Sequence, residues 1–127
     1  MRQYNTMDCP ITNFVEVYST EHGAVFQCNN RNCYWLEFAK SRTPFRVSEF
    51  LKFKKQIDAI DVSLLLGDCS RSADFTIVMP PHTERCYVLC VQDILRLREI
   101  LNGAKFMIEL NSMVRECLHN TPARVIG

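Results

Sequence analysis

Glycine is scarce in this sequence, and its distribution excludes one large class of binding sites. The four glycines are isolated along the chain, at Gly23, Gly67, Gly103 and Gly127. Phosphate-binding loops need several glycines close together, because only a backbone without side chains can approach the phosphates closely. The sequence therefore excludes the glycine-rich nucleotide-binding motifs.

The chain also lacks an excess of charge of either sign. Its 15 Lys and Arg residues against 14 Asp and Glu residues leave a formal net charge of +1. The protein as a whole therefore has no electrostatic attraction to the phosphate backbone of a nucleic acid. A local basic surface around Trp35, with residues such as Arg31, Arg46 and Lys52, is the alternative. Neighbouring carboxylates dilute its field, so we do not expect a nucleic-acid partner.

Long apolar runs are missing as well. No run approaches the roughly 20 residues that a helix needs to span a bilayer. The first ten residues include Arg2, Asn5, Asp8 and Pro10 and lack the apolar centre of a secretory signal. We therefore expect no membrane partner and a cytoplasmic location.

Length and composition indicate one globular domain. The chain has 127 residues, of which 47% are hydrophobic and 23% are charged. A globule of this size can bury about two-thirds of the surface that its unfolded chain exposes, which is enough for a real core. We predict a single domain over residues 1–127, with a loosely held N-terminal arm at residues 1–12 and a tail at residues 121–127.

Two stretches, Val47–Asp58 and Val91–Asn102, show the same amphipathic helical pattern at an offset of 44 residues. The residues predicted to be buried are Phe50, Phe53 and Ile57 on the first stretch and Ile94, Leu97 and Leu101 on the second. Only two of the twelve aligned positions are identical. Internal duplication and independent convergence on one helical pattern both remain open. Either origin predicts two strand-then-helix units around one core.

Stretches rich in aromatic and β-branched residues predict the strands. These stretches are residues 14–19, 24–28, 33–39, 45–47, 74–79 and 86–90. We predict an α+β domain with a single, mainly antiparallel sheet of about five or six strands and two or three helices packed on one face. A strand–strand–helix pseudo-duplication is possible within this arrangement.

Local signals predict where the helices begin and end. Ser48 is the expected N-cap of the first helix. Asn102-Gly103 predicts a left-handed end to the second helix. A further helical stripe follows at Phe106 to Leu118, although its first apolar residues also alternate as in a strand. Residues 61–68 could continue the first helix or form a buried strand.

Cysteine is abundant, and two of the seven cysteines form the best candidate for a chemical site. Their odd number and the expected cytoplasmic location favour thiols or metal ligands over a disulfide framework. Cys28 and Cys33 flank a four-residue loop, a spacing that zinc knuckles use. Cys86 and Cys90 cannot complete the site from a strand, because they would lie about 13 Å apart. We expect no cofactor, with zinc at Cys28 and Cys33 as the alternative.

Catalysis has weaker support than interaction. A cysteine nucleophile needs a nearby base, and the three histidines fall in predicted turns or near a helix end. We assign no catalytic residue and keep a thiol-dependent enzyme as an alternative. We favour a non-enzymatic interaction or ligand-binding domain that forms a homodimer or binds another protein. The expected interaction surface is an exposed sheet face or edge at Phe26, Trp35 and Phe45.

One segment resembles a known type of domain. The run Cys33-Tyr34-Trp35-Leu36-Glu37-Phe38, preceded by Cys28 and followed by Val47-Ser48-Glu49-Phe50, resembles small uncharacterised bacterial domains of unknown function. In those domains a cysteine-flanked hairpin leads into a strand and then a helix. The resemblance covers about Ala24 to Asp58. It implies a small cytoplasmic protein without a known activity, and no catalytic residue is carried over.

Overall fold

The computed structural model describes residues 14–28, 33–67, 76–80 and 86–120. Four strands form an antiparallel sheet in the order β1-β2-β3-β4: β1 (Phe14–Thr20), β2 (Gly23–Cys28), β3 (Cys33–Phe38) and β4 (Ser41–Arg46). A separate two-stranded ribbon consists of β5 (Thr76–Val78) and β6 (Tyr87–Leu89). The helices are α2 (Val47–Asp58), α3 (Val62–Gly67) and α4 (Val91–Asn120).

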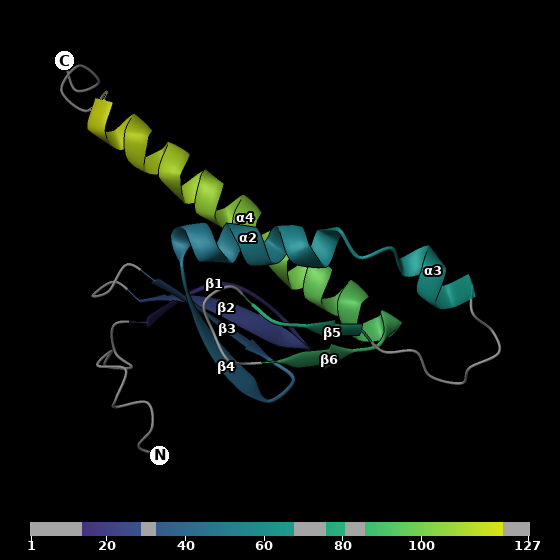
Figure 1. Cartoon of the computed structure of the whole chain (residues 1–127). Coiled ribbons are helices and arrows are strands. Elements are labelled where there is room, and N and C mark those ends of the chain that lie inside the picture. Colours follow the sequence, from purple (N-terminus) through teal and green to yellow (C-terminus); the bar gives the residue numbers. More distant parts are fainter. Residues whose placement is uncertain (1–13, 29–32, 68–75, 81–85, 121–127) are drawn as a thin grey trace.

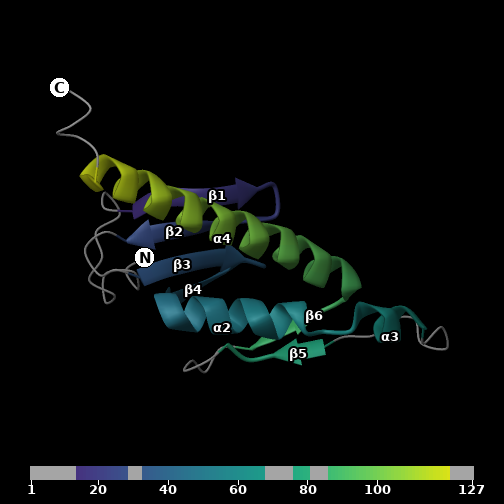
Figure 2. The same ribbon diagram turned by 90° about the horizontal axis from the view of Figure 1, so that it is seen from above.

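The helices α2 and α4 lie over one face of the four-stranded sheet (Figure 1). Seen from above, α4 runs diagonally across this face, α2 lies near β4 at one edge of the sheet, and the β5–β6 ribbon lies beside α2 (Figure 2). This arrangement confirms the α+β prediction. The six described strands are divided between two sheets, whereas the sequence analysis placed them in one.

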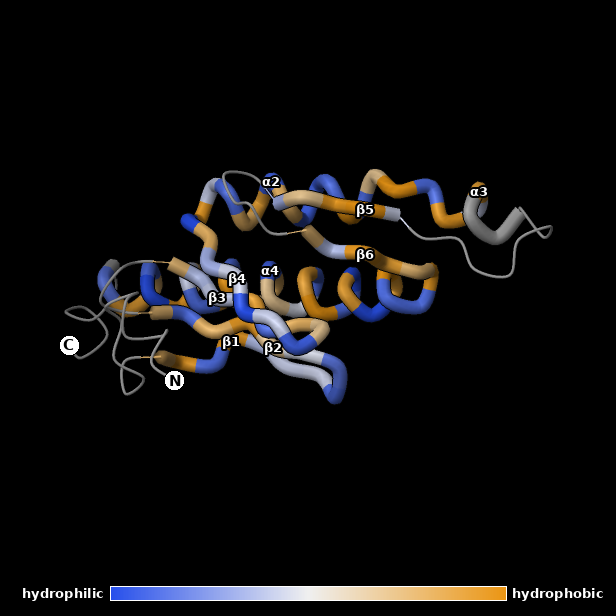
Figure 3. Tube along the Cα trace, turned by 60° about the horizontal axis from the view of Figure 1, so that its bottom comes forward, coloured by the Kyte–Doolittle hydropathy of each residue, from blue (hydrophilic) through white to orange (hydrophobic). Residues whose placement is uncertain are grey.

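The core lies between the sheet and the two helices. Strand residues such as Val25, Leu36 and Phe45 point into it because side chains alternate between the two faces of a sheet. The helices contribute the six residues expected from the repeated pattern: Phe50, Phe53, Ile57, Ile94, Leu97 and Leu101. Each of the six is at most 1% exposed, which confirms both apolar stripes. The tube coloured by hydropathy shows apolar segments of strands and helices facing one another (Figure 3).

The hairpin between β3 and β4 is tighter than predicted. The two strands were predicted at residues 33–39 and 45–47, but β4 already begins at Ser41. The turn consists of Ala39 and Lys40 alone, with φ values of 53° and 63°. Two consecutive positive φ values are typical of the type I′ turn, whose twist matches that of the flanking strands. Neither residue is the Gly or Asn that normally signals this turn, so the pattern did not indicate it.

Both long helices begin in the same way. In α2 the backbone N–H of Arg46 donates to a carboxylate oxygen of Glu49 at 3.0 Å. In α4 the backbone N–H of Cys90 donates to Asp93 at 3.2 Å, again three residues further on. The first helix therefore begins at Val47, and the prediction of Ser48 as its N-cap is wrong. In both helices the carboxylate in the first turn accepts a hydrogen bond from the backbone N–H of the residue before the helix.

The helix α4 is longer than predicted. Asn102-Gly103 was expected to end it, but the helix continues without interruption from Val91 to Asn120. Gly103 faces the ring of Tyr18 on β1, and a Cβ atom at this position would overlap that ring. The glycine therefore allows close packing of helix against strand. The stripe from Phe106 to Leu118 is helical, as predicted, but belongs to this same helix.

The structure tests only some of the remaining predictions. Residues 61–68 contain the short helix α3, where the carboxylate of Asp61 accepts a hydrogen bond from the backbone N–H of Ser63 at 3.1 Å. The hydroxyl of Ser63 donates to the same carboxylate, and this side-chain bond is the main reason that the pKa of Asp61 lies below its usual value. The predicted N-terminal arm, the loop at residues 29–32 and the tail lie outside the described residues. Among the described helices, none has an apolar stretch long enough to cross a membrane.

Candidate functional site

The cysteine pair lies at the open end of the β2–β3 hairpin. Cys28 and Cys33 are directly opposite each other in the strand register, as the sequence predicted. Both lie on the sheet face that α2 and α4 do not cover, in a small cluster with Trp35, Phe14 and Phe26. Cys28 is buried and Cys33 is half-buried. The two sulfur atoms could supply at most two of the four ligands of a structural zinc.

The described part of the chain contains no group of three His, Cys, Asp or Glu side chains that could hold a metal ion. Cys86 is exposed, and Cys90 is half-buried at the start of α4. The thiol of Cys90 donates to a carboxylate oxygen of Asp93 at 3.3 Å. Cys90 therefore takes part in the hydrogen bonding at the start of α4.

The three residues expected to form an interaction surface do not share one. Phe45 points into the main core, is 1% exposed and stacks on Phe53 with ring centroids 5.1 Å apart. Trp35 is buried, and Phe26 half-buried, on the opposite face of the sheet. The register explains this separation, because Phe45 pairs with Tyr34 while Trp35 pairs with Phe26. The expected surface at Phe26, Trp35 and Phe45 is therefore not present as one exposed face.

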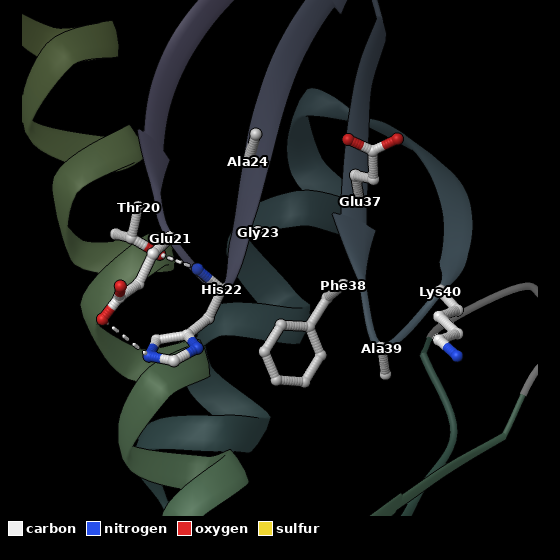
Figure 4. Close-up of a pocket in the computed structure, with 9 residues that line it drawn as sticks. All are labelled: Thr20, Glu21, His22, Gly23, Ala24, Glu37, Phe38, Ala39 and Lys40. Atoms are coloured by element: carbon white, nitrogen blue, oxygen red, sulfur yellow. Dashed lines mark hydrogen bonds and ion pairs between the residues drawn. The ribbon is translucent and has the colours of Figure 1, made fainter.

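A shallow hollow of about 290 Å³ lies between two strand turns, where β1 meets β2 and β3 meets β4. The imidazole of His22 lies 3.5 Å from the carboxylate of Glu21, while Glu37 and Lys40 line the other side (Figure 4). The hollow contains no cysteine among its lining residues. It therefore gives no support to a Cys–His catalytic pair.

Of the other two histidines, the structure describes only one, and it adds no catalytic arrangement. His82 lies outside the described residues. His119 is exposed near the end of α4, and one of its ring nitrogens is 3.0 Å from the backbone oxygen of Arg115. The thiol-dependent enzyme remains a hypothesis without a site among the described residues.

The most unusual exposed feature is a line of apolar side chains on the second half of α4. We call it the distal stripe, and its members are Phe106, Leu110, Met113, Val114 and Leu118. All five are exposed, with Phe106 at 62% and Leu118 at 65%. Their spacing of three and four residues places them along one side of the helix.

Although Leu118 at its end lies within about 40° of Ala104 around the helix, the distal stripe as far as Val114 does not continue the side of α4 that packs on the core. That side carries Leu97, Leu101 and Ala104, all buried. Phe106 follows Ala104 by two residues, which is about 200° around the helix, so it points away from the sheet. The C-terminal half of α4 also extends past the end of α2 (Figure 1). Nothing in the described part of the chain buries the stripe.

A polar side chain takes the place of an apolar one on the sheet-facing side of this half. Arg115 follows Leu97, Leu101 and Ala104 at helical spacing and lies close enough to Tyr34 to act on its phenol. Burial raises the pKa of Tyr34, and the positive charge of Arg115 opposes this rise. Arg115 therefore occupies the sheet-facing side of the distal half, while Phe106 and Leu110 face outward.

Charged residues border the distal stripe on one flank. The ammonium group of Lys105 forms an ion pair with Glu109 at 3.0 Å, one helical turn away. Glu116 follows two turns further along the same flank. The stripe at Phe106 to Leu118 was predicted from its helical spacing, without a prediction of what would cover it.

Comparisons of the chain with protein-family models, curated proteins and solved structures found no match. This outcome agrees with the resemblance to domains of unknown function, which supplies no activity either.

Proposed function

We propose that this protein is a non-enzymatic interaction domain that forms a homodimer through the distal stripe of α4. The observation that supports the proposal is the exposure of five apolar side chains along the second half of a well-formed helix. Contiguous exposed apolar surface on a protein of this size is typical of an interaction site.

The chemistry of the stripe favours a helical protein partner. Apolar residues at spacings of three and four can interdigitate with the same pattern on a second helix. A membrane surface is less suitable, because helices that lie on membranes carry Lys and Arg beside their apolar side. Here two of the three charged residues that border the stripe, Glu109 and Glu116, are acidic, and anionic lipids would repel them.

Sedimentation equilibrium with substitutions in the stripe tests the proposal. We expect the chain of 14.8 kDa to be dimeric at about 100 µM, because a modest interface of this kind supports micromolar affinity. Phe106→Glu should yield a monomer with an unchanged circular dichroism spectrum, since Phe106 is exposed and makes no core contact. Leu64→Glu, at an exposed apolar position on α3, is the matched control and should leave the dimer intact. A wild-type protein that stays monomeric at this concentration would refute the proposal.

A further inference from the structure

We propose that the two α4 helices of the dimer run antiparallel, with Leu110 next to the two-fold axis and Lys105 facing Glu116 of the partner subunit. This inference rests on the proposed function, because it specifies how two copies of the distal stripe meet. It also names the charged residues that determine which pairing forms.

The positions of Lys105 and Glu116 on the helix support this orientation. Eleven residues separate them, which is close to three full turns, so they lie within about 20° of each other on the same flank. They are about 16 Å apart along the helix axis. Their charges are opposite, and the midpoint between them falls next to Leu110, in the stripe.

An antiparallel two-fold pairing brings the same flank of each helix together. When Leu110 meets Leu110 of the partner subunit, Phe106 lies at the level of Val114 of the partner subunit. The same register places Lys105 within one residue, about 1.5 Å along the axis, of the level of Glu116 of the partner subunit, twice by symmetry. One register therefore pairs apolar with apolar residues and opposite charges with each other.

A parallel pairing lacks this match. Two parallel helices bring the charged flank of one against the opposite flank of the other. That opposite flank carries Asn111, which is uncharged. Parallel pairing would therefore leave Lys105 and Glu116 without partners between subunits. It would also align the two helix dipoles unfavourably.

Charge reversal and mixing test the orientation. Lys105→Glu alone should place the introduced carboxylate against Glu116 of the partner subunit at both ends of the interface. Glu116→Lys alone should place the introduced ammonium group against Lys105 of the partner subunit in the same way. Each variant should raise the dissociation constant of its homodimer about tenfold, the effect expected for two exposed contacts turned from attraction to repulsion. Lys55→Glu, at an exposed position on α2, is the control and should leave the constant unchanged.

Mixing the two variants distinguishes the possible results. An equimolar mixture of Lys105→Glu and Glu116→Lys restores opposite charges at both contacts, so we expect a heterodimer at least as tight as the wild-type dimer. About 0.5 M salt should reduce all these differences, because it screens exposed charges. Two results would overturn the antiparallel arrangement while leaving self-association intact, provided that the wild-type protein is dimeric. Either both variants form homodimers with the wild-type dissociation constant, or mixing the two variants does not restore the affinity. A monomeric wild type would instead overturn the proposed function.

Discussion

Gly103 shows how one residue can have two opposite meanings in a sequence. An Asn-Gly pair after an amphipathic stripe normally indicates the end of a helix, because glycine accepts the left-handed conformation that ends many helices. Here the helix continues, and the glycine instead gives Tyr18 room to pack against the backbone of α4. Only the position of β1 beneath the helix distinguishes these meanings, and local sequence does not contain that position.

Gly103→Ala provides a test with a defined sign. Helix propensity alone predicts a gain of about 1 kcal/mol when alanine replaces glycine inside a helix. The added methyl group would overlap the ring of Tyr18, so we expect overpacking to dominate and to lower the free energy of unfolding by about 1–3 kcal/mol. Asn102→Ala, at the exposed neighbouring position, is the control and should stabilise by about 0.5 kcal/mol. Chemical denaturation measures both, and a stabilised Gly103→Ala variant would contradict the packing argument.

Most of the regular elements follow from local patterns, because apolar spacing determines which side of an element is buried. The limits of α2 are those predicted from its stripe, and β1, β2 and β3 are each within one residue of the prediction. The errors lie at turns and helix ends. The start of β4 was placed four residues late, because Ala39 and Lys40 give no sign of a turn with two positive φ values.

The same turn offers a stabilising substitution. Ala39 and Lys40 carry side chains in a backbone region that costs them energy, whereas Asn and Gly adopt it readily. We expect the double change Ala39→Asn and Lys40→Gly to raise the free energy of unfolding by about 1–2 kcal/mol. Asn and Gly introduced at Glu21 and His22, where φ is not positive, should give no such gain. Thermal denaturation of the two variants measures the difference, and equal effects at both turns would count against this explanation.

At the scale of the whole molecule, the repeated helical pattern corresponds to two repeated units. β3, β4 and α2 form one strand–strand–helix unit, and β5, β6 and α4 form the other. The units share the placement of the acidic residue that holds the start of each helix, Glu49 in one and Asp93 in the other. The loop between the strands is longer in the second unit, and its helix continues beyond the core. That extension carries the distal stripe.

The candidate site was only half predictable from the sequence. Periodicity identified an apolar stripe from Phe106 onward, but period alone does not say whether a stripe meets the protein's own sheet or another molecule. That depends on how α4 is rotated about its axis, and Ala104 and Leu101 determine this rotation by packing on the core. Trp35 and Phe45 failed as surface candidates for the same reason. Strand pairing determined which face each of them occupies.

The two units meet at Thr43 and Tyr87, which are equivalent positions 44 residues apart. Their hydroxyl oxygens lie 2.7 Å apart in a buried hydrogen bond. Thr43→Val or Tyr87→Phe alone removes one hydroxyl of this pair and leaves the other without this hydrogen bond. Each variant should therefore lower the free energy of unfolding by about 1–3 kcal/mol.

The double variant removes both hydroxyls of this pair. Its loss in the free energy of unfolding should therefore be smaller than the sum of the losses in the two single variants. We expect the coupling energy from a double-mutant cycle to be at least about 1 kcal/mol. Ser41→Ala, which removes a weaker contact to Tyr87 at 3.4 Å, is the control and should cost less than either single variant. Additive effects of Thr43→Val and Tyr87→Phe in urea denaturation would show that this hydrogen bond does not couple the two units.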